Sequence, residues 1–296
     1  MIFSEPQYVH PGRSRSASPD LPYLFLLPGM GGYDPDLVEI GVACKNAVRP
    51  VKISYPPWRT QLRDPGFDLS ALVNDVVKQI TAHCSTAPIL LAGYSFGGIV
   101  AFAVATRLRD AGYPVQFLGL LDTEVQPGVD FVTGVPYPPM TRRRELKGFI
   151  AALRRGDAKG KLAFVLAREL SKRRWKPALR LFARTPRRWL HGEFLVLLDR
   201  DLLSWHIQPM LWQWAALRKT LPPLPVPAVL FRTDHHDPSA LRHLGWKYYC
   251  PRLTVVSVPG THNGMLGPSN LPTLCAIFRN TVLQALASGL HRGTVS

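Results

Sequence analysis

The sequence predicts an α/β fold with a mostly parallel central sheet flanked by helices. Short apolar runs rich in β-branched residues alternate along the chain with stretches of helical period, and this alternation is typical of parallel sheets. At 296 residues the chain is long enough to bury a sizeable core. The expected strands cover residues 23–27, 47–54, 88–93, 115–121, 226–231 and 253–258.

Each of these elements follows from the spacing of its apolar residues. The first run, YLFLL at 23–27, ends at Pro28 and Gly29, as a strand buried on both faces does, and the later runs have similar length and composition. Helices are expected at 69–83 and 98–111, where apolar residues return every three or four positions. Strand and helix therefore alternate through the first part of the chain.

The alternation stops between about 125 and 221, where helical patterns occur without a convincing strand. We interpret this segment as a helical insertion between two strands of the sheet. The expected organisation is a flexible tail over 1–20, a single domain over 21–290 that contains the insertion, and a short C-terminal tail over 291–296.

The charge of the chain is strongly basic, +16 from 36 Lys and Arg against 20 Asp and Glu. Most of the excess lies within the insertion, where 17 Lys and Arg between 141 and 188 stand against three acidic residues. No apolar run has membrane-spanning length, and the N-terminus lacks the features of a signal peptide. The widely spaced cysteines predict reduced core thiols of a cytoplasmic protein and no zinc site: Cys44, Cys84, Cys250 and Cys275.

The motif that carries chemistry is Gly93-Tyr94-Ser95-Phe96-Gly97, which fits G-x-S-x-G. It follows an expected buried strand and precedes an expected helix, which is the context of a nucleophile elbow. The glycines leave room for the reversing backbone, and the helix start directs N–H groups at developing negative charge. Ser95 is therefore the candidate nucleophile, and a structural turn without chemistry is the alternative.

A serine nucleophile needs a base, which a third group orients. His262 follows the strand 253–258 directly, so it lies on the same edge of the sheet as Ser95 and is the candidate base. His235 and His236 follow the strand 226–231 and could line the site, but an Asp-flanked turn favours solvated side chains.

The third group of the site has two candidate positions. Asp122 follows the strand 115–121, one strand after the nucleophile, and is preferred. Asp234 and Asp237 follow the strand after that and are the alternative acids. All three lie at the carboxyl edge of the predicted sheet.

Acyl transfer also needs two N–H donors for the oxyanion of the tetrahedral intermediate. We expect them to be the backbone N–H groups of Phe96, which follows the nucleophile, and of Met30 in the Gly-rich loop 28–32. This loop has neither G-x-G-x-x-G nor a G-K-S/T ending, so nucleotide binding is not expected.

At these residues the chain resembles the α/β-hydrolase thioesterase domains of non-ribosomal peptide and polyketide synthases. The resemblance covers nearly the whole chain after the tail and rests on LFLLPGMGG (24–32), LLAGYSFGGIVAFAVATRL (90–108), LGLLDT (118–123) and VVSVPGTHNGML (255–266). It implies an α/β-hydrolase fold with a helical lid over about 125–221 and an acid at Asp122. It also implies a thioesterase that needs no cofactor and moves an acyl or peptidyl chain from the phosphopantetheine of a carrier protein to Ser95, then releases it by hydrolysis or cyclisation.

The implied partner is an acyl or peptidyl carrier protein acting in trans, because the chain shows no carrier signature. Carrier domains are typically acidic, so the basic lid residues Arg142, Arg143, Arg144, Arg173 and Arg174 are candidate docking residues. Solvated helix faces, or contact with an anionic membrane surface, are alternative interpretations of this charge. Nucleic acid is not an expected partner, since no recognised binding module accompanies the charge.

Two other functions remain open at this point. A carboxylester hydrolase or an acyltransferase uses the same three side chains, so the motifs alone do not separate either from a thioesterase. A non-catalytic module that binds a carrier or a membrane is the alternative outside enzymes.

Overall fold

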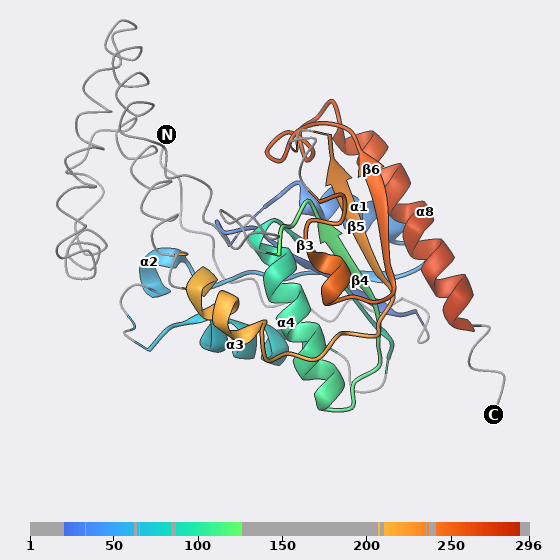
Figure 1. Cartoon of the computed structure of the whole chain (residues 1–296). Helices are drawn as coiled ribbons and strands as arrows, with labels where there is room; N and C mark the ends of the chain where they lie inside the picture. Colours follow the sequence, from blue (N-terminus) through green and yellow to red (C-terminus); the bar gives the residue numbers. More distant parts are fainter. Residues whose placement is uncertain are drawn as a thin grey trace, which may run out of the picture.

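The computed structural model describes residues 21–32, 34–61, 64, 66–83, 87–125, 207, 210–234, 236 and 241–290. They form one six-stranded sheet in the order β2-β1-β3-β4-β5-β6, and every neighbouring pair of strands is parallel. Figure 1 shows this twisted sheet with helices on both faces. The predicted parallel α/β fold is confirmed.

All six predicted strands are present: β1 (Tyr23–Leu27), β2 (Arg49–Lys52), β3 (Ile89–Tyr94), β4 (Val115–Leu121), β5 (Ala228–Thr233) and β6 (Leu253–Val258). Strand β5 begins two residues later than predicted. Pro225 and Pro227 precede it, and proline has no N–H to donate to a neighbouring strand. Pro50 lies within β2, which is an edge strand, where a missing donor is tolerated.

The described helices are α1 (Leu37–Cys44), α2 (Trp58–Gln61), α3 (Leu69–Thr81), α4 (Phe96–Asp110) and α8 (Leu271–Leu290), and a short 3₁₀ helix covers Trp246–Tyr248. Helix α3 begins where Asp68 caps it, because the Asp68 carboxylate accepts a hydrogen bond of 2.8 Å from the Ala71 N–H. Helix α4 begins two residues before the predicted start, directly after Ser95.

The core consists of two apolar layers, one on each face of the sheet. Phe25 and Leu27 of β1 pack with the buried faces of α3 and α4, whereas Leu24 and Leu26 pack with those of α1 and α8. Figure 1 shows these two pairs of helices on opposite faces. Burial on both faces explains why β1 is a continuous apolar run rather than an alternating one.

The strand order places a topological switch point beside Ser95. From β1 the chain runs outward to the edge strand β2 and then returns past β1 to β3, so β1 and β3 are neighbours in the sheet. In open parallel sheets ligands bind at the carboxyl ends of the strands at such a point. The loop after β1 and the turn after β3 therefore meet where the site is expected.

Most of the predicted insertion lies outside the described residues, as do both predicted tails. Residues 210–217 are helical and belong to its end. In this segment Trp214 is buried, and its Nε1–H donates a hydrogen bond of 2.6 Å to the Val125 carbonyl oxygen at the start of the predicted insertion. The two ends of the predicted insertion are therefore joined by a buried contact.

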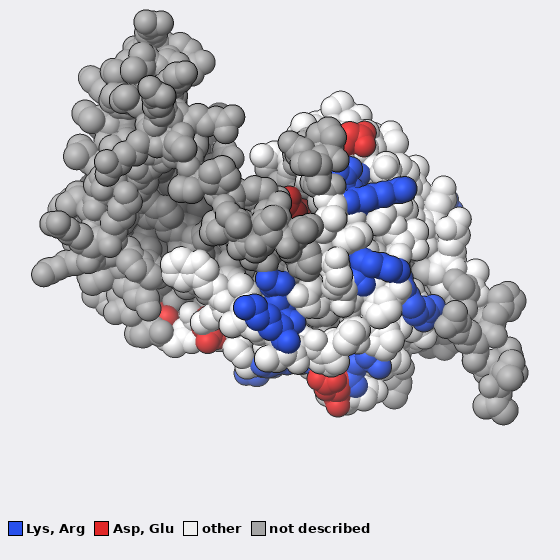
Figure 2. All heavy atoms as spheres, viewed as in Figure 1, with Lys and Arg blue, Asp and Glu red and all other residues white. Residues whose placement is uncertain are grey.

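The candidate docking residues Arg142, Arg143, Arg144, Arg173 and Arg174 lie outside the described residues. On the face drawn in Figure 2, the described Lys and Arg side chains form separate groups among neutral residues rather than one continuous patch. Cys44 and Cys250 are buried free thiols and Cys275 is partly buried, while Cys84 is not described. Among the helices that the structure describes, none has the length and apolarity needed to cross a membrane.

Candidate active site

The turn between β3 and α4 holds Ser95 in an uncommon backbone conformation, with φ +54° and ψ −121°. A positive φ is unfavourable for a residue with a side chain, so the surrounding structure must hold it. The Ser95 N–H donates to the Leu121 carbonyl oxygen at 3.0 Å, and its own carbonyl oxygen accepts from the Gly98 N–H at 3.0 Å. These contacts form the strained strand-to-helix turn that the G-x-S-x-G pattern predicts.

Two glycines of the motif are required by close backbone contacts. A Cβ at Gly93 would collide with the carbonyl group of Gly97, and a Cβ at Gly97 would collide with the carbonyl oxygens of Leu27 and Pro28. The second contact also places the start of α4 directly against the end of β1 and its following loop. The two segments expected to supply the oxyanion donors are thus adjacent.

The three side chains singled out from the sequence form a continuous hydrogen-bonded chain. Ser95 Oγ lies 2.9 Å from Nε2 of His262, and Nδ1 of His262 lies 2.9 Å from Oδ2 of Asp122. They come from the ends of three strands: Ser95 follows β3, Asp122 follows β4 and His262 follows β6. A serine, a base and an orienting carboxylate in this order are the geometry of nucleophilic acyl transfer.

Tyr94 holds His262 in place, a role that the sequence analysis missed. Its hydroxyl donates a hydrogen bond of 2.7 Å to the His262 carbonyl oxygen, and the two rings stack with centroids 5.4 Å apart. Burial, together with the negative charges of Asp34 and Asp122, raises the pKa of Tyr94 to about 12. The hydroxyl therefore stays protonated at neutral pH and remains a donor.

Asp122 is a buried carboxylate with hydrogen-bond donors on both oxygens. Oδ2 faces His262, and Oδ1 accepts from the Thr233 N–H at 2.9 Å and lies 2.9 Å from Nε2 of His236. Burial alone would raise the pKa of this carboxyl, but the hydrogen bonds from His262, Thr233 and His236 outweigh it. The pKa of Asp122 is consequently well below its usual range. Asp122 is thus ionised at neutral pH.

The prediction of a solvated side chain is wrong for His236. Its side chain is 6% exposed and lies between two carboxylates, with Nδ1 3.4 Å from Oε1 of Glu124. Burial raises the pKa of Glu124, with the charge of His236 acting against this and that of Asp122 adding to it. The chain turns back after β5 and brings His236 onto Asp122, which the spacing of the residues alone did not indicate.

Of the alternative acids, Asp234 is exposed in the turn after β5, and Asp237 lies outside the described residues, as does His235. Among the described acidic side chains, Asp122 is the one that contacts His262. The structure thus joins the preferred candidate, and not Asp234, to the histidine.

The candidate oxyanion donors belong to the start of α4 and to the loop after β1. Phe96 is the first residue of α4, so its N–H has no partner within the helix. Met30 lies in the loop after β1, where Asp34 accepts a hydrogen bond of 2.6 Å from the Gly29 N–H. Burial raises the pKa of Asp34, and that N–H acts against it. Asp34 thereby closes the loop that carries Met30.

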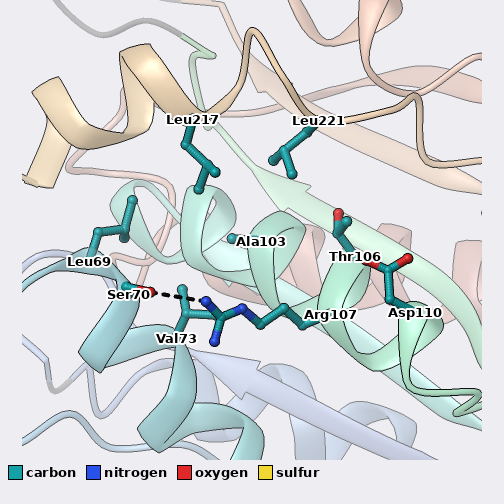
Figure 3. A pocket seen from close by; sticks show the side chains of 9 residues that line it. All are labelled: Leu69, Ser70, Val73, Ala103, Thr106, Arg107, Asp110, Leu217 and Leu221. Carbon is teal, nitrogen blue, oxygen red and sulfur yellow. Dashed lines mark hydrogen bonds between the residues drawn. The ribbon is translucent and has the colours of Figure 1, made fainter.

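The cavity drawn in Figure 3 is separate from these residues. It lies between α3, the second half of α4 and residues 217–221, and Arg107 on its wall donates a hydrogen bond of 2.9 Å to Ser70 Oγ. Neither Ser95, Asp122 nor His262 lines it. Within the described parts of the chain, no cluster of three or more His, Cys, Asp or Glu side chains is arranged to hold a metal ion.

Part of the chain matches a family of known proteins. Residues 22–131 match the model of the thioesterase domain family. The chain resembles thioesterase domains. Over 145 residues it is 28% identical to "Thioesterase TesA" of Mycobacterium marinum, and the match covers 47% of this chain and 53% of that protein. The chain thus spans about half the length of TesA, and a much smaller share of longer curated proteins that it also matches.

Solved structures of thioesterase domains share the fold. The Vlm2 thioesterase domain, solved with a bound dodecadepsipeptide, is 22% identical with a TM-score of 0.54, and the alignment covers 88% of this chain and 93% of that one. A four-domain nonribosomal peptide synthetase aligns with a TM-score of 0.55 at 18% identity, over 88% of this thioesterase-like chain and 19% of the synthetase. The fold is therefore the α/β-hydrolase fold.

Proposed function

We propose that this chain is a serine thioesterase, which releases an acyl or peptidyl chain from the phosphopantetheine thiol of a carrier protein through an acyl-enzyme on Ser95. The observation that carries the proposal is the hydrogen-bonded chain from Ser95 through His262 to Asp122 at a nucleophile elbow. The match of residues 22–131 to the thioesterase domain family supports a thioester as the bond that is broken.

In the first half of the reaction, Ser95 Oγ attacks the thioester carbonyl carbon. Nε2 of His262 accepts the Ser95 proton, and the ionised Asp122 holds the Nδ1–H and stabilises the imidazolium that forms. The N–H groups of Phe96 and Met30 donate to the oxyanion. The carbon–sulfur bond then breaks, and His262 returns the proton to the departing pantetheine sulfur.

In the second half, the acyl-enzyme is broken by a second nucleophile. His262 takes a proton from water, or from an amine or hydroxyl of the bound chain, as that group attacks the ester carbonyl carbon. The bond between that carbon and Ser95 Oγ then breaks, and His262 returns the proton to Ser95. Attack by water gives a free acid, whereas attack by an internal group gives a ring. Whether water reaches the acyl-enzyme determines which product forms.

The proposed partner is a carrier protein acting in trans, with Arg142, Arg143, Arg144, Arg173 and Arg174 contributing to docking. Two solved relatives support this class of substrate: one thioesterase domain was solved with a bound depsipeptide, and another similar chain is a nonribosomal peptide synthetase. The reaction needs no further cofactor. Free thiols at Cys44, Cys250 and Cys275 support a cytoplasmic location for it.

Kinetics on matched pairs of esters test this proposal. Octanoyl-pantetheine and an octanoyl ester of an alcohol of similar size differ in the leaving atom, sulfur or oxygen. We expect a higher kcat/KM for the thioester, and a loss of roughly 10⁶-fold in turnover for Ser95→Ala. A Ser95-dependent preference for the oxygen ester would indicate a carboxylester hydrolase instead of a thioesterase. Carrier binding without turnover of either compound would favour a non-catalytic binding module.

A further inference from the structure

The Asp122 carboxylate is held at both of its oxygens, whereas orientation of His262 uses only one. Oδ2 faces Nδ1 of His262, and the opposite oxygen, Oδ1, lies 2.9 Å from Nε2 of His236. The side chain of Asp122 is 0% exposed and that of His236 is 6% exposed. The second histidine is therefore as much a part of the buried arrangement as the carboxylate it contacts.

The donor in this contact is defined by the chemistry of the two groups. Asp122 is ionised, and an ionised carboxylate only accepts hydrogen bonds, so the proton between the two groups lies on Nε2 of His236. The other ring nitrogen, Nδ1, lies 3.4 Å from Oε1 of Glu124, which holds the ring from its far side. Two carboxylates at the end of β4 thus fix one imidazole that follows β5.

Rotation of a carboxylate about its last side-chain bond is only weakly restricted, because that torsion joins an sp³ carbon to an sp² carbon. In Asp122 the Thr233 N–H anchors Oδ1 at one point. A second donor on the same oxygen, from another direction, restricts this rotation further. His236 supplies that donor.

We propose that His236 is a positioning residue of the active site, whose Nε2–H holds Oδ1 of Asp122 so that Oδ2 stays aimed at His262. Its role in turnover rests on the serine thioesterase activity proposed above. Glu124 supports it by holding the opposite edge of the imidazole. His236 acts through Asp122 and His262 and takes no proton from substrate.

Two variants of equal side-chain length test this role. His236→Gln keeps an N–H donor at the position of Nε2, whereas His236→Met has a similar length and no donor. Losing one hydrogen bond to a charged acceptor is expected to lower kcat by about tenfold in the Met variant. KM for octanoyl-pantetheine should change little. The Gln variant should recover most of the loss, which a purely space-filling role of His236 does not predict.

A second readout requires no thioester. A fluorophosphonate phosphonylates an activated serine, so its rate of reaction with Ser95 reports the state of the Ser95–His262 pair directly. We expect slower labelling in His236→Met than in wild type, with recovery in His236→Gln. If the labelling rates of the three proteins follow this order but wild type cleaves no thioester, the proposed function fails and the role of His236 stands.

Thermal unfolding of the three proteins supplies the folding control. A His236→Met protein with wild-type unfolding temperature and undiminished kcat and labelling rate would overturn the inference. Equal losses in the Gln and Met variants, with both folded, would also overturn it, because the Nε2–H bond would then not be the cause. Should the Met variant fail to fold, the comparison of wild type with His236→Gln and Glu124→Gln decides. His236→Gln should then be labelled at a near-normal rate, and Glu124→Gln should be labelled clearly more slowly than wild type. An unchanged labelling rate in Glu124→Gln would contradict the support assigned to Glu124.

Discussion

Replacing Asp122 by Asn removes one charge and exchanges one acceptor for a donor while keeping the shape of the side chain. The structure determines which way the new amide points. Among the residues that the structure describes, two groups donate to Oδ1, the Thr233 N–H and Nε2 of His236, and one group, Nδ1 of His262, donates to Oδ2. The amide oxygen will therefore occupy the Oδ1 position, because the reverse orientation places its NH₂ group against two donors.

In that orientation the amide NH₂ faces Nδ1 of His262, so Nδ1 must become the acceptor and the ring proton must move to Nε2. A protonated Nε2 is unable to take the proton of Ser95, whose Oγ lies 2.9 Å away. The same change in a Ser-His-Asp triad lowers kcat by about 10⁴-fold, and about the same loss is expected here. This equals roughly 5 kcal/mol of transition-state stabilisation, at about 1.4 kcal/mol for each factor of ten.

The assay is steady-state cleavage of octanoyl-pantetheine by wild type, Asp122→Asn and the control Asp234→Asn, with thermal unfolding of each protein. Asp234 is exposed in the turn after β5, so its variant should retain wild-type kcat. A folded Asp122→Asn protein with less than a tenfold loss would show that Asp122 does not set the tautomer of His262. A loss of kcat in Asp234→Asn, with none in Asp122→Asn, would show that Asp234 orients His262.

Three further predictions concern the residues around this site. Tyr94→Phe removes the hydrogen bond to the His262 carbonyl, so it should lower kcat and cost about 1 kcal/mol of unfolding free energy in urea; unchanged values for both would show that the hydroxyl is dispensable. Gly97→Ala introduces a Cβ against two carbonyl oxygens at the end of β1 and should lower the free energy of unfolding by about 3 kcal/mol. In the control Gly31→Ala a Cβ meets no atom within 4 Å, so stability should not change. Equal unfolding midpoints for the two variants would contradict the predicted collision at Gly97. Because the pKa of Asp122 is lowered on folding, its stabilisation is present above the pKa of an unfolded aspartate, about 3.9, and is lost as the pH falls. Urea unfolding between about pH 5 and pH 2 should therefore show a steeper loss of stability in wild type than in Asp122→Asn, and parallel slopes would count against a lowered pKa.

Much of the sheet could be predicted from the sequence because burial on both faces leaves a direct signal. Every residue from Leu24 to Leu27 is buried, so the strand reads as an unbroken apolar run. Helix α1 (Leu37–Cys44) was not predicted, because it is short and its buried face includes a glycine and a cysteine. Its stability comes from packing against α8, which no local pattern reveals.

The three linked side chains of the site could be located because parallel strands end at one edge of the sheet. Ser95, Asp122 and His262 each follow a strand of the sheet closely, so sequence position alone brought them near one another. The contacts of Tyr94 and His236 could not be predicted in the same way. They depend on side-chain direction and on how the turn after β5 folds back, and neither leaves a pattern in the sequence.

Intact-protein mass after brief mixing with octanoyl-pantetheine shows whether Ser95 carries the acyl group. The wild-type protein should gain the mass of one octanoyl group, and peptide mapping should place it on Ser95. Ser95→Ala should gain none. An octanoyl group on another residue, or turnover that survives in Ser95→Ala, would contradict the account.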